Sequence, residues 1–143
     1  MTFEMTESGK ALAIEHVNAL CKNAARIAEE HGFKENTVGE DIALMHSELS
    51  EALEDFRGHE SPSHTWYEIT EKKGPNIEIK QRYTENPDPD GTLKPCGIPS
   101  ELADCVIRIM HFSHRHGIDL GKAIVEKMAF NETRVYRHGN KKI

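Results

Sequence analysis

The chain is poor in cysteine and has no long apolar run. Only Cys21, Cys96 and Cys105 occur among its 143 residues, with no CxxC pair. This odd, widely spaced set predicts neither a disulfide framework nor a cysteine zinc site, and it fits the reducing cytoplasm, where we expect the protein. The sequence has no run near the roughly 20 apolar residues of a membrane span and no signal-peptide pattern, so we expect no membrane partner.

The chain also lacks an excess of basic residues. It carries 24 acidic against 18 basic residues, a formal net charge of -6. This charge does not attract nucleic acid polymers, so we expect none as a partner. A hydrophobic content of 37% and a charged content of 29% are typical of a globular protein, and the length suits one domain over residues 1–143.

Helical periodicity is present in four segments. Apolar residues recur at three- and four-residue spacing from about Ser8 to His31, from Thr37 to Gly58, from Ser100 to His116, and from Asp119 onward to a basic tail that begins at Val135. Each segment begins with a residue whose side chain can cap a helix. Thr37 and Glu40 also have the spacing of a capping box. The sequence therefore predicts an all-α fold, a four-helix bundle.

The predicted bundle has apolar stripes that we expect to face inward. The expected inward residues are Ile42, Met45, Leu49, Leu53 and Phe56 on the second helix, Leu102, Val106, Ile109 and Met110 on the third, and Leu120, Ala123, Ile124 and Met128 on the fourth.

Residues 58–99 differ in character from the rest. They contain all six prolines of the chain and several turn signals, while segments 65–70 and 77–83 carry β-branched and alternating residues. We expect a long loop or a short β-hairpin inserted between the second and third helices. A loop of this length in a compact domain is either a functional lid or an inert insertion.

Two pairs of acids stand out on the second and third helices. Glu48 and Glu51 form one acid-x-x-acid pair, and Glu101 and Asp104 form the other. Residues three apart are neighbours on a helix face. Glu48 and Glu101 fall at the border of their apolar stripes, and their partners lie one step further toward the polar side. The two helices are therefore expected to bring matching acid pairs to the surfaces that pack together.

Such a cluster of acids has two interpretations. Four carboxylates at a half-buried seam repel one another, so a divalent cation would make the arrangement favourable, and oxygen ligands without histidine or thiolate suit Mg²⁺, with Mn²⁺ as the other candidate. The ordinary reading is a solvated helix face, because acid pairs at this spacing are common on surfaces.

Polar residues also line the end of the fourth helix. Lys127, Asn131 and Arg134 share one side of it, and they could bind phosphate oxygens or orient a sugar. Alternatively, the cations simply complement the helix dipole. Arg108 lies four residues after Asp104, where it could pair with that acid or help to hold phosphate.

Three segments together resemble the MazG-like, all-α nucleoside triphosphate pyrophosphohydrolases. They read LMHSELSEALEDFR (44–57), KPCGIPSELADCVIRIMHFSHRHGIDLGKAI (94–124) and KMAFNETRVYRHG (127–139). They supply ExxE, then ExxD within IPSELADCVIRI, and finally K-x-x-x-N-x-x-R. ExxE alone is a weak signal, whereas this ordered combination is specific.

The resemblance implies the remaining expectations. It implies a homodimer or homotetramer in which Glu48, Glu51, Glu101 and Asp104 hold Mg²⁺. By the same resemblance, Lys127, Asn131 and Arg134 contact the triphosphate of a (deoxy)nucleoside triphosphate.

The expected reaction is Mg²⁺-dependent hydrolysis of that substrate to the monophosphate and pyrophosphate, as in cleansing of the nucleotide pool. Metal chemistry favours attack of an activated water on the α-phosphorus, with Glu51 as the residue that orients or deprotonates it and Arg108 as a further phosphate contact. Two alternatives stay open: a phosphoribosyl-ATP pyrophosphohydrolase, and a non-catalytic helical regulator that binds nucleotide or a partner protein.

Overall fold

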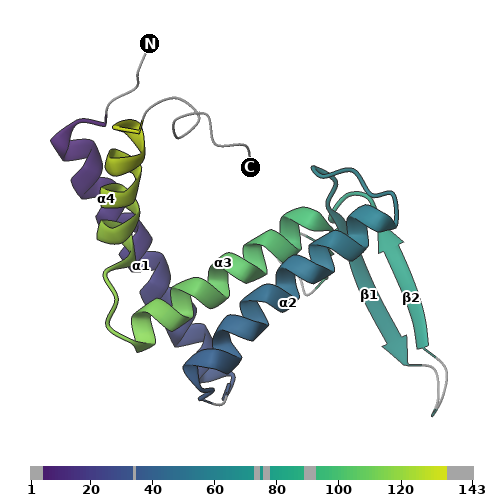
Figure 1. Ribbon diagram of the computed structural model, residues 1–143. Helices are drawn as coiled ribbons and strands as arrows, with labels where there is room; N and C mark the ends of the chain where they lie inside the picture. Colours follow the sequence, from purple (N-terminus) through teal and green to yellow (C-terminus); the bar gives the residue numbers. More distant parts are fainter. Residues whose placement is uncertain (1–4, 34, 73–74, 76–77, 89–92, 135–143) are drawn as a thin grey trace. The chain divides into compact units, whose positions relative to one another are not determined.

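A computed structural model describes residues 5–33, 35–72, 75, 78–88 and 93–134. The described part of the chain is mostly helical, 62% of those residues, with a small three-stranded sheet between its second and third helices. The elements are α1 (Glu7–Glu30), α2 (Val38–Arg57), β1 (Trp66–Lys72), β2 (Glu78–Tyr83), β3 (Lys94–Cys96), α3 (Ile98–Arg115) and α4 (Leu120–Glu132) (Figure 1). None of the helices described has the length and apolarity needed to span a membrane.

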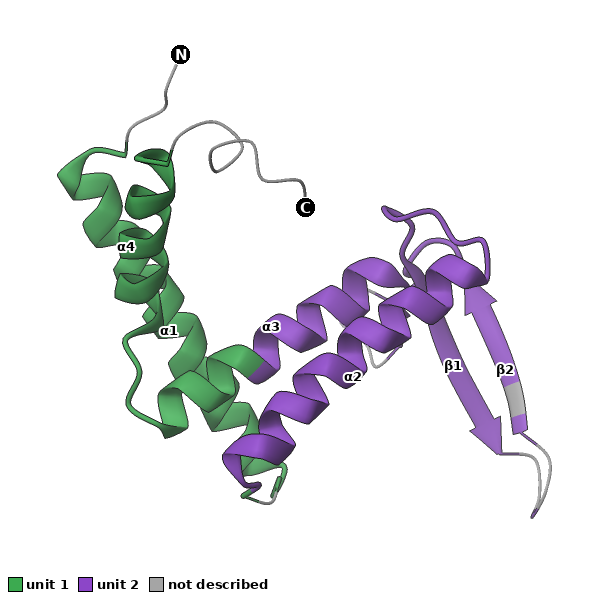
Figure 2. Ribbon diagram, in the orientation of Figure 1, with its two compact units in different colours: residues 1–35, 109–143 green, residues 36–108 purple. Residues whose placement is uncertain are grey.

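The chain divides into two compact units. One comprises residues 1–35 and 109–143, and the other comprises residues 36–108 (Figure 2). α3 contributes its first part to the second unit and its last residues to the first unit. The expectation of one bundle is therefore shown only in its coarser form, four helices with an insert.

The first unit is built on the packing of α1 against α4. Gly121 of α4 lies so close to the backbone of Ile14 that a Cβ atom there would come within 2.6 Å of the Ile14 carbonyl oxygen. Asn18 of α1 joins the two helices, since its side-chain amide donates to Asp119 and its oxygen accepts from the Gly121 amide. A small residue and a bifunctional amide thus let two helices approach closely.

The second unit begins with a strongly capped α2. The Thr37 hydroxyl accepts from the Glu40 amide, and the Glu40 carboxylate accepts from the Thr37 amide, so the predicted capping box is confirmed. The helix ends at Arg57 with Gly58 as its C-cap, as the sequence predicts. This exact start fixes the orientation of every later side chain on α2.

The insert folds as a sheet with strand order β2-β1-β3, both pairs antiparallel. The hairpin of β1 and β2 was expected, whereas β3 was not. Trp66 pairs with Cys96 and Glu68 pairs with Lys94. Because residues directly opposite in a sheet share a face, Trp66, Glu68, Lys94 and Cys96 lie on one face. Trp66 and Cys96 are buried, which identifies this face as the inward one.

Two predicted helix caps were wrong. α1 begins at Glu7 because Thr6, not Ser8, accepts from the Gly9 amide. α3 begins at Ile98, before the predicted cap Ser100, whose hydroxyl donates instead to the Pro95 carbonyl. In contrast, Asp119 caps α4 as expected, by accepting from the Lys122 amide.

The predicted burial of the apolar stripes was also wrong in large part. On α2 the buried residues are Glu48 and Ala52, and on α4 they are Gly121 and Val125. The stripe residues that stay exposed in the part of the chain described are Ile42, Leu49, Leu53, Phe56, Leu102, Val106, Ala123, Ile124 and Met128. Periodicity places residues on one helix face, but it does not say what covers that face.

Candidate metal centre

Helices α2 and α3 bring three carboxylates together within the second unit. One carboxylate oxygen from each of Glu48, Glu101 and Asp104 lies within 4.8 Å of the other two. α2 supplies the first, while the opening turns of α3 supply the others. This separation suits a single small cation that takes one oxygen from each group.

The exposure of the three carboxylates follows the order that the sequence predicts, with Asp104 nearer to the polar side than Glu48 and Glu101. Glu48 and Glu101 are only 6% and 7% exposed, whereas Asp104 is exposed. These are the positions that the sequence places at the stripe border and one step beyond it. The cluster therefore has two oxygen donors shielded from water and one donor at its open side.

Glu101 is buried, yet no cation is bonded to its carboxylate in the part of the chain described. Burial raises the pKa of its carboxyl group, the charge of Glu51 raises it further, and the cation of Lys94 partly offsets both effects. No hydrogen bond or ion pair holds this carboxylate among the described residues. A buried acid without a partner is costly unless a cation joins it.

Glu51 lies outside the group of three. It is exposed, and its oxygens are not among those that converge within 4.8 Å. It is nevertheless close, since it is the charged group that acts most strongly on Glu101. Of the four predicted ligands, the structure thus brings three together and leaves Glu51 beside them.

Arg108 has a different partner from the one expected. Its Nε donates to Glu48 Oε1 at 2.5 Å and so joins α3 to α2, whereas the sequence suggested a pair with Asp104. Helical spacing identifies neighbours on one helix, but the contact here is made between helices. The guanidinium balances one buried acid and leaves the cluster with a net negative charge.

The other predicted substrate-binding residues belong to the first unit. Lys127 and Asn131 are exposed on α4, and Arg134 follows the helix, which ends at Glu132. Both cations lie 5.1 Å from the ring centroid of Phe130, on which they can stack. Their expected contact with a triphosphate stays a prediction.

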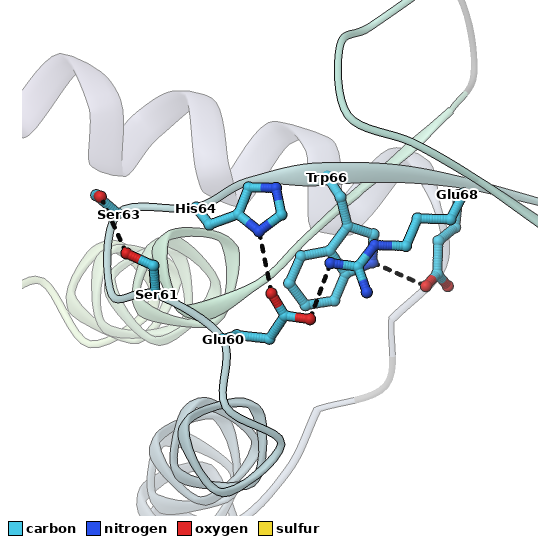
Figure 3. A network of polar contacts seen from close by, with 7 residues as sticks. Glu60, Ser61, Ser63, His64, Trp66 and Glu68 are labelled. Atoms are coloured by element: carbon cyan, nitrogen blue, oxygen red, sulfur yellow. Dashed lines mark hydrogen bonds and ion pairs between the residues drawn. The ribbon is translucent and has the colours of Figure 1, made fainter.

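A polar network anchors the sheet to the segment after α2. Glu60 accepts from Arg82 at 2.8 Å and bonds to His64 at 3.0 Å, while the Trp66 indole donates to Glu68 at 2.8 Å (Figure 3). Arg82 also stacks on Trp66, 4.0 Å from the ring centroid. His64 and Arg82 hold the pKa of Glu60 below its usual range. This network fixes β1 and β2, and through them β3.

Sequence reasoning missed two charged residues beside the cluster. Asp55 lies four residues after Glu51, on the same face of α2, and burial raises the pKa of its carboxyl group. Lys94 acts electrostatically on both Asp55 and Glu101. The helical spacing could have identified Asp55. Lys94 could not be found in this way, because its place depends on β3.

A separate cavity of about 260 Å³ lies in the first unit. It is lined in part by His111, His114 and Phe33. None of the clustered carboxylates lines it. Its two histidines do not form part of a metal-binding group among the described residues. The carboxylate cluster, rather than this cavity, is therefore the candidate functional site.

Comparison with known proteins identifies no relative: no family model, no curated protein and no solved structure matches the chain.

Proposed function

We propose that the protein is a Mg²⁺-dependent hydrolase that converts a (deoxy)nucleoside triphosphate to the monophosphate and pyrophosphate. The observation that carries this proposal is the convergence of Glu48, Glu101 and Asp104 from two helices, with two of the three carboxylates buried. The likeness of the ExxE, ExxD and K-x-x-x-N-x-x-R segments to MazG-like enzymes supports it.

The donor set fits a hard divalent cation. All three converging ligands are carboxylates, which suit Mg²⁺ or Mn²⁺ and give no preference to softer metals. The buried carboxylate of Glu101 supports the same conclusion, because a bound cation would supply the counter-charge that Arg108 supplies only to Glu48. When bound, the metal would neutralise phosphate charge and lower the pKa of a coordinated water.

Individual residues of the chain would then assist different steps of the hydrolysis. Glu51, exposed and adjacent to Glu101, would accept a proton from the attacking water. The water oxygen would bond to the α-phosphorus while the bond from that phosphorus to the bridging oxygen breaks. By the family resemblance, Lys127 and Arg134 would stabilise the charge of the leaving pyrophosphate, and Asn131 would orient the triphosphate.

The proposal is tested by a panel of ribo- and deoxyribonucleoside triphosphates with Mg²⁺ in ¹⁸O-labelled water. We expect equal amounts of monophosphate and pyrophosphate, with the label in the monophosphate. Orthophosphate as the first product, or label in pyrophosphate, would contradict attack at the α-phosphorus. Phosphoribosyl-ATP belongs in the same panel, since preferential turnover of it would favour that alternative.

A substitution tests the assigned base. Glu51→Gln keeps the size of the side chain and is exposed, so we expect an unchanged melting temperature and a loss of pyrophosphate release of about 100-fold or more. Glu54→Gln, an exposed acid on the same helix, serves as the control and should retain activity. Near-normal turnover by Glu51→Gln would remove Glu51 from the mechanism.

A further inference from the structure

Lys94 is a cation whose position is dictated by the sheet. It begins β3, pairs with Glu68 of β1, and shares the inward sheet face with Trp66 and Cys96. Immediately after β3, Gly97 turns the chain into α3, and its carbonyl accepts from the Glu101 amide. The strand that carries Lys94 is thus joined by one tight turn to the helix that carries Glu101 and Asp104.

The charge of Lys94 acts on acids from both helices of the cluster region. It opposes the rise that burial causes in the pKa of Glu101 on α3, and it does the same for Asp55 on α2. No side-chain hydrogen bond or ion pair within 4.0 Å engages its ammonium group in the part of the chain described. Its charge acts on carboxylates of both helices, yet it is bound to none of them.

Arg108 and Arg82, two other cations of the second unit, are already engaged. Arg108 is bonded to Glu48, and Arg82 is bonded to Glu60 while it stacks on Trp66. Lys94 is exposed and sits on a flexible four-carbon stem, so its ammonium can turn toward an anion at little cost. It is therefore the cation here that is best able to meet an incoming phosphate.

We propose that Lys94 is a phosphate-binding residue of the metal centre, contributed by the inserted sheet. The inference rests on the proposed function and adds to it a contact for the polyphosphate of the substrate. A phosphate bound at a metal held by Glu48, Glu101 and Asp104 would have Lys94, the cation that acts on Glu101, as a counter-charge. The insert would then complete the substrate site.

The test compares Lys94→Gln and Lys94→Arg with Lys80→Gln. Lys80 is an exposed lysine of β2 opposite Thr70, on the same sheet face, and it is not among the charges that act on Glu101 or Asp55. Two quantities are measured for each variant: steady-state kinetics with nucleoside triphosphate and Mg²⁺, and calorimetric binding of inorganic pyrophosphate in the presence of Mg²⁺.

We expect Lys94→Gln to raise KM and to weaken pyrophosphate binding about tenfold, with kcat changed far less. The melting temperature should fall only slightly, because Lys94 partly offsets the charges of Glu101 and Asp55. Lys94→Arg should recover part of the loss because it restores the charge, and Lys80→Gln should match the wild type. Unchanged KM and pyrophosphate affinity in Lys94→Gln would overturn the inference, as would an equal loss in Lys80→Gln.

The same measurements separate the two proposals. If the wild type hydrolyses no nucleoside triphosphate but binds pyrophosphate with Mg²⁺, the proposed reaction is wrong. The role of Lys94 is then tested by comparing the pyrophosphate affinities of the Lys94 variants with that of the wild type. If the wild type hydrolyses nucleotides and Lys94→Gln is indistinguishable from it, only the assignment of Lys94 fails. A wild type that neither hydrolyses nucleotides nor binds pyrophosphate overturns both.

Discussion

At the scale of single residues, the carboxylate of Glu101 is the most informative group in the molecule. It is buried, it has acidic neighbours on both helices, and its pKa is raised first by burial and then by Glu51. An acid in this state lowers the stability of the metal-free fold. Residues that reduce stability in this way are typical of sites where function requires them.

Glu101→Gln should therefore stabilise the protein when no divalent cation is present. A raised carboxyl pKa means that the folded chain binds the proton more tightly than the unfolded chain, so this group lowers stability as pH rises from the ordinary carboxyl range through the raised pKa. At pH 7 in EDTA we expect the variant to melt a few degrees above the wild type, and the difference should vanish below about pH 4.

Mg²⁺ should reverse this order. We expect millimolar Mg²⁺ to raise the melting temperature of the wild type and to leave that of Glu101→Gln unchanged, because the variant lacks a charged ligand. Glu15→Gln, at an exposed position of α1, is the control and should follow the wild type throughout. A variant less stable than the wild type in EDTA would show that Glu101 is a structural acid with a partner.

At the scale of secondary-structure elements, the turn between β3 and α3 positions half of the cluster. Gly97 has φ of +104°, and a Cβ atom there would lie 2.5 Å from the His64 carbonyl oxygen and 2.8 Å from the Trp66 ring. The first of these contacts is with backbone, which cannot move aside cheaply. Gly97 therefore couples the sheet to the start of the helix that carries Glu101 and Asp104.

Gly97→Ala should destabilise the protein by about 2 kcal/mol, through both the unfavourable φ and the overlap with neighbouring atoms. We also expect reduced affinity for Mg²⁺, because α3 must shift. Gly39→Ala is a matched control: it lies in the first turn of α2 with open space around its Cα, and alanine there should be neutral or stabilising by up to about 1 kcal/mol. Urea unfolding of both variants measures this. A Gly97→Ala protein as stable as Gly39→Ala would contradict the role of the turn.

The elements also show what the sequence could and could not predict. Local signals succeeded where the interaction is local, as at the Thr37–Glu40 capping box and the Asp119 cap. β3 was missed because it is short, contains Pro95, and exists only by pairing with β1, far away in the sequence. The convergence of Glu48, Glu101 and Asp104 could be predicted from the acid-x-x-acid spacing on two helices, although the apolar stripes beside them stay exposed. The bond from Arg108 to Glu48 could not, because it depends on the relative rotation of two helices.

At the scale of the whole molecule, the second unit has an exposed apolar face on α2 that is suited to association with another copy of the chain. Ile42, Leu49, Leu53 and Phe56 follow one side of α2, and all are more than 45% exposed. Contiguous apolar patches of this kind mark association surfaces. Two copies of the same helix pair related by a twofold axis would bury these stripes against each other, so we expect a homodimer, or a tetramer made of two such dimers.

Light scattering after gel filtration tests this expectation. We expect a mass of two or four times 16.2 kDa, and Leu53→Glu should shift the protein toward the monomer because it places a charge within the buried stripe. Leu12→Glu, at an exposed leucine of α1, is the reference substitution and should not change the mass. A wild type that is monomeric at tens of micromolar would contradict self-association through this face.

The function proposed here depends above all on whether a divalent cation binds between α2 and α3. Crystals grown with Mn²⁺ and measured near the manganese absorption edge decide this directly. We predict an anomalous peak within about 2.5 Å of oxygens from Glu48, Glu101 and Asp104, and its loss in Glu101→Gln. A wild-type map without a peak among these three carboxylates at millimolar Mn²⁺ would contradict the metal centre and the hydrolase built on it.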